Sequence, residues 1–314
     1  MPHDLDRALD TIMARSLALR PGEQVLVVGD HVSRALAEAM RDAAARHGAD
    51  AVLTLMDPRE NDGSEPPPTV AAALAACDAF LAPTSRSLSH TRARKAANDG
   101  GARGATLPGA TAEMIARVMS VDFAAMKART LAVTELLSQA DEARVTCPHG
   151  SDLRLDLTGR TAMADIGEMT RPGTFGNLPA GEGFIAPRSG EGTVAATSLA
   201  PLGISPEPVV LTVEDGHLTA AQGPLGPEFI KRLVAHGDAG TNIAELGVGT
   251  NDAATLTGNV LEDEKILGTV HVAFGASMGI GGTVSVPIHL DVVVLEPTLV
   301  VGGTTVLDAG RWVL

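Results

Sequence analysis

The residues best able to do chemistry lie in the C-terminal half of the chain, where a single residue separates His289 from Asp291. They occur in an otherwise apolar run, residues 288–294, which predicts a β-strand. Successive side chains of a strand point to opposite faces, so His289 and Asp291 share a face and can bind one metal ion. Such a pair also occurs in apolar strands without binding metal, so the prediction depends on further ligands.

A second imidazole, His271, lies in the apolar run of residues 269–274. A buried imidazole needs a polar partner to offset the loss of its hydration. A metal ion and a hydrogen-bonding partner within the core both satisfy that need, so His271 is a candidate ligand with a structural alternative.

Two glutamates have unusual neighbours in the sequence. Glu182 lies between Gly181 and Gly183, whose flexible backbone allows a side chain to be aimed into a site. Glu245 is surrounded by small and apolar residues, where an unpaired charge would be costly. An exposed loop glutamate is the alternative for each.

Together these residues offer three carboxylates and two imidazoles, and no thiolate. This set suits hard or borderline divalent metals such as zinc, cobalt or manganese. It is also large enough for two ions that share a bridging carboxylate. The sequence therefore predicts a divalent-metal site in a metalloenzyme.

The composition excludes several classes of function. With 24 basic and 38 acidic residues the formal charge is −14, which argues against binding to nucleic acids or anionic membranes. A small-molecule or peptide substrate fits better. The two cysteines, Cys77 and Cys147, lack Cys-X-X-Cys spacing, so we expect buried apolar side chains rather than disulfides or a zinc site.

The beginning of the sequence has no basic segment followed by an apolar run, so we expect no signal peptide. No stretch approaches the roughly 18 consecutive apolar residues of a membrane span. We therefore expect the protein in the cytoplasm.

The elements that must position the candidate ligands fall into two predicted domains. Residues 1–140 alternate helical and extended segments, which indicates a Rossmann-like α/β domain with a mainly parallel sheet. The turn at residues 29–34 holds one glycine, so the Gly-X-Gly-X-X-Gly fingerprint of dinucleotide binding is absent. Ser33 is the expected N-cap of the helix that follows, and residues 124–140 are expected to form a helix between the domains.

Residues 141–314 contain more glycine and threonine and many short β-rich runs. Helices are expected only near residues 227–235 and around Asn242. This pattern predicts an α+β metal-binding domain with a mixed or antiparallel sheet.

An ordered series of segments resembles a known family. The segments are residues 177–182 (NLPAGE), 244–247 (AELG), 263–265 (DEK), 268–271 (GTVH) and 289–291 (HLD). Over about residues 177–291 this series is similar to the aminopeptidase T (leucyl aminopeptidase) family of dimetal metallopeptidases, and weaker similarity includes residues 90–91 and 107–109. The resemblance implies a two-domain subunit, a homodimer and metal ligands at Glu182, Glu245, His271, His289 and Asp291.

The sequence departs from that family at one position. Longer members carry a tyrosine shortly after the first ligand histidine, where this chain has Ala276-Ser277-Met278-Gly279, and the chain contains no tyrosine at all. Lys265 and Arg188 are available as replacement donors, or they are partners in structural ion pairs.

The leading hypothesis is an aminopeptidase-like, metal-dependent hydrolase that cleaves an N-terminal peptide bond or a related amide. Two bound ions would activate a bridging water, and Glu182 would accept its proton. The alternative is a mononuclear Fe(II) dioxygenase that opens hydroxylated pyridine rings, which is similar in fold and needs two histidines and one carboxylate. That relative replaces the glutamates aligned with Glu182 and Glu245, so their presence favours the hydrolase. A third possibility is a non-catalytic protein that kept the ligands.

Overall fold

The computed structural model describes residues 2–314 and forms two compact units. The first unit comprises the residues up to Val121 together with Gly167–Ala180, and the second comprises Asp122–Ile166 and Gly181–Leu314. The sequence suggested a single division at residue 140. In the structure, the helix expected at residues 124–140 belongs to the second unit, and a later segment returns to the first.

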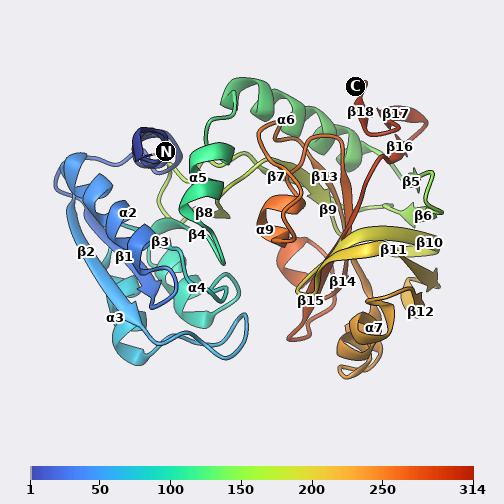
Figure 1. The fold of residues 1–314 in the computed structure, drawn as a ribbon, viewed down its shortest axis with the longest axis horizontal. Coiled ribbons are helices and arrows are strands. Elements are labelled where there is room, and N and C mark those ends of the chain that lie inside the picture. The colour runs from blue at the N-terminus through green and yellow to red at the C-terminus, as the bar shows by residue number, and fades with distance from the viewer. Residues whose placement is uncertain (1) are drawn as a thin grey trace. The chain divides into compact units, whose positions relative to one another are not determined.

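The first unit contains a parallel sheet of five strands in the order β2-β1-β3-β4-β8 (Figure 1). The strands are β1 (Gln24–Asp30), β2 (Asp50–Met56), β3 (Ala79–Ala82), β4 (Arg103–Thr106) and β8 (Phe175–Asn177). The predicted parallel sheet is confirmed. Its last strand comes from the returning segment, which adds β8 beside β4.

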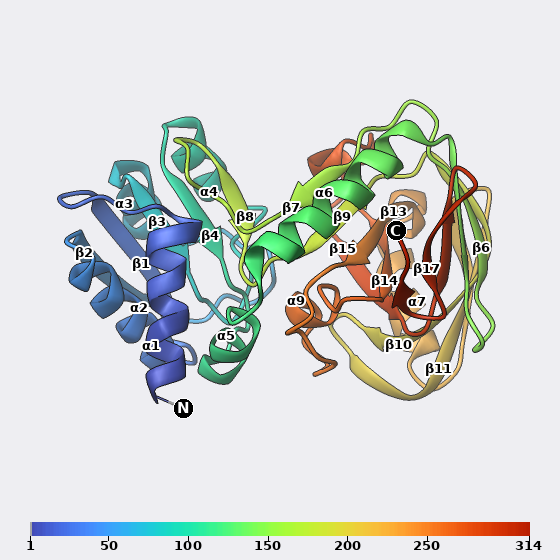
Figure 2. The same cartoon turned by 90° about the horizontal axis from the view of Figure 1, so that it is seen from above.

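Helices cover both faces of this sheet. They are α1 (Pro2–Thr11), α2 (Arg34–Arg46), α3 (Pro68–Ala76), α4 (Arg92–Asp99) and α5 (Ala112–Val118). Figure 2 shows α1, α2 and α5 on one face and α3 and α4 on the other. The hydroxyl groups of Thr91 and Thr111 accept hydrogen bonds from the first turns of α4 and α5, as N-cap residues do. Ser33 occupies the N-cap position of α2 without making this bond, because its side chain contacts Asp30 instead.

The second unit is built on a sheet whose paired strands are all antiparallel, which confirms the predicted α+β class. The order is β18-β17-β16-β5-β6-β10-β15-β14-β13-β9-β7, and β11 joins β10 to β12. The first strands are β5 (Glu142–Thr146), β6 (Asp152–Asp156), β7 (Met163–Asp165), β9 (Glu182–Ile185), β10 (Ser189–Leu199), β11 (Gly203–Glu214) and β12 (His217–Gln222). The remaining strands are β13 (Ile243–Gly249), β14 (Val270–Gly275), β15 (His289–Val294), β16 (Thr298–Val301), β17 (Thr304–Asp308) and β18 (Arg311–Trp312).

The helices of this unit are α6 (Phe123–Gln139), α7 (Gly226–Val234), α8 (Asp238–Thr241) and α9 (Val260–Asp263). The side chain of Asp122 caps α6, which packs on β9 and β7. The core joins α6 and α7 to the strands of the sheet, and it includes Leu246, Val272, Phe274 and Val292. Over residues 2–314, no helix is both long enough and apolar enough to cross a membrane.

Candidate metal centre

Four strands that are neighbours in the second sheet carry the five predicted ligands. Their order is β15-β14-β13-β9 (Figure 1). His289 and Asp291 lie on β15, His271 on β14, Glu245 on β13, and Glu182 at the start of β9. The structure thus brings together residues that are far apart in the sequence, because each lies on a strand hydrogen-bonded to the next.

The register of β13 leaves space for the ligands of its neighbours. Gly247 lies opposite His271, and Gly249 lies opposite Glu182. A Cβ atom on Gly247 would lie only 1.9 Å from His271 Nε2. Strand alternation places Glu245, Gly247 and Gly249 on the same face. The glycine at 247 is therefore required for the imidazole to lie over the strand.

The glycines beside Glu182 have a different role from the predicted one. A Cβ atom on Gly183 would lie 2.7 Å from Thr134 Oγ1 on α6, and one on Gly181 would lie 2.8 Å from Asn251 Cβ. They allow close packing of β9 rather than flexibility. Glu182 is consequently buried, with 7% of its surface exposed, and is no loop glutamate.

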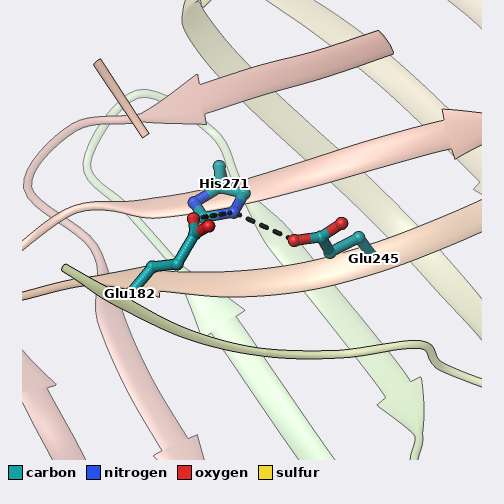
Figure 3. A group of neighbouring side chains, drawn as sticks. All are labelled: Glu182, Glu245 and His271. Carbon is teal, nitrogen blue, oxygen red and sulfur yellow. Dashed lines mark hydrogen bonds and ion pairs between the residues drawn. The ribbon is translucent and has the colours of Figure 1, made fainter. Parts of the chain in front are cut away.

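The functional atoms of these side chains converge. His271 Nε2 lies 3.2 Å from Glu182 Oε2 and 3.3 Å from Glu245 Oε1 (Figure 3). His289 Nε2 lies 3.3 Å from Glu245 Oε2 and 3.5 Å from Asp291 Oδ1. Glu245 thus lies between the two imidazoles and belongs to two groups of three side chains that could hold a metal ion.

The hydrogen bond of His289 shows what these atoms require. Its Nδ1 lies 2.7 Å from the carbonyl oxygen of Ala276, which can only accept, so Nδ1 carries the proton. The lone pair of a neutral His289 is then on Nε2, which faces two carboxylates. Such an arrangement repels unless a cation lies between the groups, and a metal ion or an extra proton meets this need. The donor set therefore fits a divalent metal.

His271 is supported differently. Its Nδ1 is buried and has no hydrogen-bond partner within the described part of the chain. The neighbouring β-strand, rather than a hydrogen bond to Nδ1, fixes this ring by packing.

The ionisation of the site agrees with a need for positive charge. Burial alone would lower the pKa of His271, but the carboxylates of Glu245 and Glu182 raise it to about 9. Burial is likewise outweighed at His289, where Asp291 and Glu245 raise the pKa well above its usual range. Hydrogen bonds from both imidazoles lower the pKa of Glu245 despite its burial. Without a metal, protons occupy the imidazole nitrogens that a metal would bind.

Two further charged residues complete the site: Lys265, which the sequence offered as a replacement donor for the missing tyrosine, and Glu264, to which no role had been assigned. Lys265 is fully buried, and its Nζ lies 2.6 Å from Glu182 Oε1 and also binds Glu264 Oε1. Glu264 forms a third potential metal-binding group with His271 and Asp291. The sequence signal for Glu264 was the DEK run, and consecutive charges of that kind are typical of a solvated surface.

The charges of this pair depend on each other. Burial raises the pKa of Glu182 to about 8, although the Lys265 ammonium opposes this rise. Burial would lower the pKa of Lys265, but Glu182 and Glu264 keep it above its usual range. Lys265 therefore stays protonated. Arg188, the other proposed donor, is exposed and lies 3.9 Å from Asp156, as expected for a surface ion pair.

Comparison with known proteins decides the family. The model of the NicX family, described as 2,5-dihydroxypyridine 5,6-dioxygenase, matches residues 8–314. The chain belongs to the NicX family. No protein of curated function matches the sequence.

Two solved structures share the fold of this NicX-family chain. The 2,5-dihydroxypyridine dioxygenase from Pseudomonas putida KT2440 is 21% identical, with a TM-score of 0.84 over 98% of this chain and 96% of that one. AmpT from Thermus thermophilus is 19% identical, with a TM-score of 0.73 over 100% of both chains. The resemblance to aminopeptidase T therefore reflects a shared fold.

The predicted hydrolase is wrong, and so is its description as a metallopeptidase. The NicX family match over nearly the whole chain favours the dioxygenase instead. The error arose because Glu182 and Glu245 were interpreted as marks of a two-metal site. In the structure Glu182 already has a cationic partner in Lys265, so its presence does not require a second metal ion.

Proposed function

We propose that this protein is an iron-dependent dioxygenase that opens the ring of a hydroxylated pyridine. The family description, 2,5-dihydroxypyridine 5,6-dioxygenase, supports both the reaction and the substrate class. The observation that carries the proposal is the overlap of two potential metal-binding groups at Asp291, which belongs to one group with His289 and to another with His271. Two histidines and one carboxylate are the ligand set of non-haem Fe(II) oxygenases.

In this proposal His271, His289 and Asp291 hold a single ferrous ion. The Ala276 carbonyl keeps the proton of His289 on Nδ1 and so directs Nε2 toward the ion. A ferrous ion held by these three residues would leave open positions for oxygen and for a substrate hydroxyl. The remaining glutamates, Glu182 and Glu245, face the same nitrogens and supply negative charge that retains a cation.

The proton-acceptor role predicted for Glu182 depended on hydrolysis and is not proposed for the dioxygenase. A small-molecule substrate, rather than a nucleic acid or a membrane, remains part of the proposal. The homodimer stays a prediction, which light scattering can test.

The test is to load the purified protein with ferrous iron without oxygen and then add 2,5-dihydroxypyridine and air-saturated buffer. We expect one oxygen consumed for each substrate and loss of the ring's absorbance. Metal analysis should find about one iron per chain. An iron-loaded protein that leaves hydroxylated pyridines unchanged would contradict the proposal.

Substitution of a ligand provides the matched comparison. We expect His289→Ala to lose iron binding and ring opening together, because it removes one of three ligands. His149→Ala is the control, since His149 is half exposed and pairs with Glu296 in the same unit. Ring opening by His289→Ala at the rate of the control would exclude the assigned ligand set.

A further inference from the structure

The environment of Lys265 is unusual for a lysine. Its side chain has 0% exposure, and Nζ contacts one carboxylate oxygen each of Glu182 and Glu264. The main chain is also fixed, because Lys265 N donates to the Glu262 carbonyl and its own carbonyl accepts from Asn251 N. An isolated buried ammonium is very costly, so this one is kept by the charges around it.

The two oxygens of Glu182 have different partners. Oε1 lies 2.6 Å from Lys265 Nζ, whereas Oε2 lies 3.2 Å from His271 Nε2. Glu182 therefore links the ammonium to the group of ligands, as a bridging carboxylate links two ions in a dimetal centre. Glu264 makes a second link, because it contacts Lys265 and also lies with His271 and Asp291.

The charges of the site point the same way. Four buried or nearly buried carboxylates surround two imidazoles, namely Glu182, Glu245, Glu264 and Asp291. With all four carboxylates ionised, the state that bound cations favour, Lys265 and one divalent ion leave a single excess negative charge. Without Lys265 one divalent ion would leave two, and a second divalent ion would balance them.

We propose that Lys265 takes the place of a second divalent ion and so restricts the centre to one metal. The inference rests on the proposed function only in its requirement for a single iron. Lys265 is then a positioning residue, because it holds Glu182 and Glu264 without touching the metal. Its ammonium uses the carboxylate oxygens that a second ion would need.

The test counts bound manganese in the wild type and in two neutral variants, Lys265→Met and Lys265→Gln. Each protein is purified with excess Mn²⁺, dialysed and analysed for metal, and its electron paramagnetic resonance spectrum is recorded. We expect one Mn²⁺ per chain with an uncoupled spectrum for the wild type. The neutral variants should bind two ions with a spin-coupled spectrum.

Two further variants control for charge. Lys265→Arg keeps the positive charge and should bind one ion. The double variant Lys265→Met/Glu264→Gln removes one positive and one negative charge together, so it should return to one ion. A purely structural lysine would not give this reversal.

The proposal is overturned if both neutral variants bind one ion, or if the wild type binds two. Failure of both neutral variants to fold in excess Mn²⁺ also contradicts it, because a second ion should replace the ammonium. The counts do not depend on activity. Failure of the proposed function would be seen in a different experiment, as wild-type, iron-loaded protein that does not open the pyridine ring.

Discussion

Asp30 in the first unit and Glu245 in the second are both buried carboxylates, and they differ in their partners. Asp30 is the last residue of β1. Its carboxylate accepts hydrogen bonds from the main-chain N–H groups and the hydroxyl groups of Ser33 and Ser85. Glu245 faces the ring nitrogens of His271 and His289. Serine and peptide groups always carry a proton to donate, whereas an imidazole nitrogen offers one only when it is protonated.

The difference separates a carboxylate with a complete set of hydrogen-bond donors from one that requires added positive charge. Hydrogen bonds complete the surroundings of Asp30, and no cation is needed there. At Glu245 the carboxylate oxygens face imidazole nitrogens that are also acceptors when neutral. These groups therefore attract one another only when a proton or a metal ion lies between them. Burial alone would not distinguish the two, because both residues are almost fully inaccessible.

The largest effect is expected from Gly247→Ala. The new Cβ would lie 1.9 Å from His271 Nε2 if nothing moved, so the ring must leave its position. Metal affinity should fall by about 100-fold or more, since even residues that only orient ligands contribute 10- to 100-fold. Titration calorimetry with Mn²⁺ measures the change.

Gly279→Ala is the matched control for this substitution. A Cβ atom there meets nothing within 4 Å, so its affinity should equal that of the wild type. If Gly247→Ala and the control bind Mn²⁺ with equal affinity, His271 is not a ligand. The contrast between Glu245 and Asp30 would then no longer hold.

A smaller effect is expected from Asp30→Asn in the first unit. The asparagine amide places N–H groups against the serine donors that the carboxylate accepts from. The free energy of unfolding should therefore fall by about 1–3 kcal/mol. Metal binding should not change. Urea denaturation followed by circular dichroism measures the loss, with Asp57→Asn as the control because Asp57 is 86% exposed.

The same carboxylate gives a pH dependence with a defined sign. Burial would raise the pKa of Asp30, but hydrogen bonds from Ser85 and Ser33 outweigh it and lower the pKa. A carboxylate with a lowered pKa stabilises the fold above its unfolded pKa of about 3.9 and loses this effect as pH falls further. The difference in free energy of unfolding between the wild type and Asp30→Asn should therefore be constant near neutral pH and should become smaller in acid. A gap that widens in acid contradicts this assignment.

The smallest effect concerns Cys77, which forms no disulfide, as the sequence predicted, but is partly rather than fully buried. Burial raises its pKa to about 11, so very little thiolate exists at pH 8. Alkylation by iodoacetamide should be about tenfold or more slower than in the unfolded chain. Peptide mapping with and without urea follows Cys77, and equal rates would show that the thiol is accessible.

The sequence predicted which candidate ligands come together, because these residues lie on strands. Alternation placed His289 and Asp291 on one face, and the apolar surroundings of His271 and Glu245 indicated burial. Periodicity likewise predicted the parallel sheet of the first unit.

What the sequence could not predict depends on contacts between distant segments. Lys265 and Glu182 are 83 positions apart, so nothing in the sequence showed that this glutamate already had a cationic partner. The function was misjudged for that reason. The return of Gly167–Ala180 to the first unit and the full length of β10, which is rich in small residues, gave no periodic signal.

The bond between His289 and Ala276 has a consequence for sequence variation. The His289 imidazole is oriented by a main-chain oxygen, which every residue type carries. The side chain at 276 can therefore change without disturbing the ring, provided the backbone keeps its path. The segment that begins with this residue is Ala276-Ser277-Met278-Gly279. A randomised library over these four positions should retain many metal-binding members, whereas one at Gly247 should retain almost none.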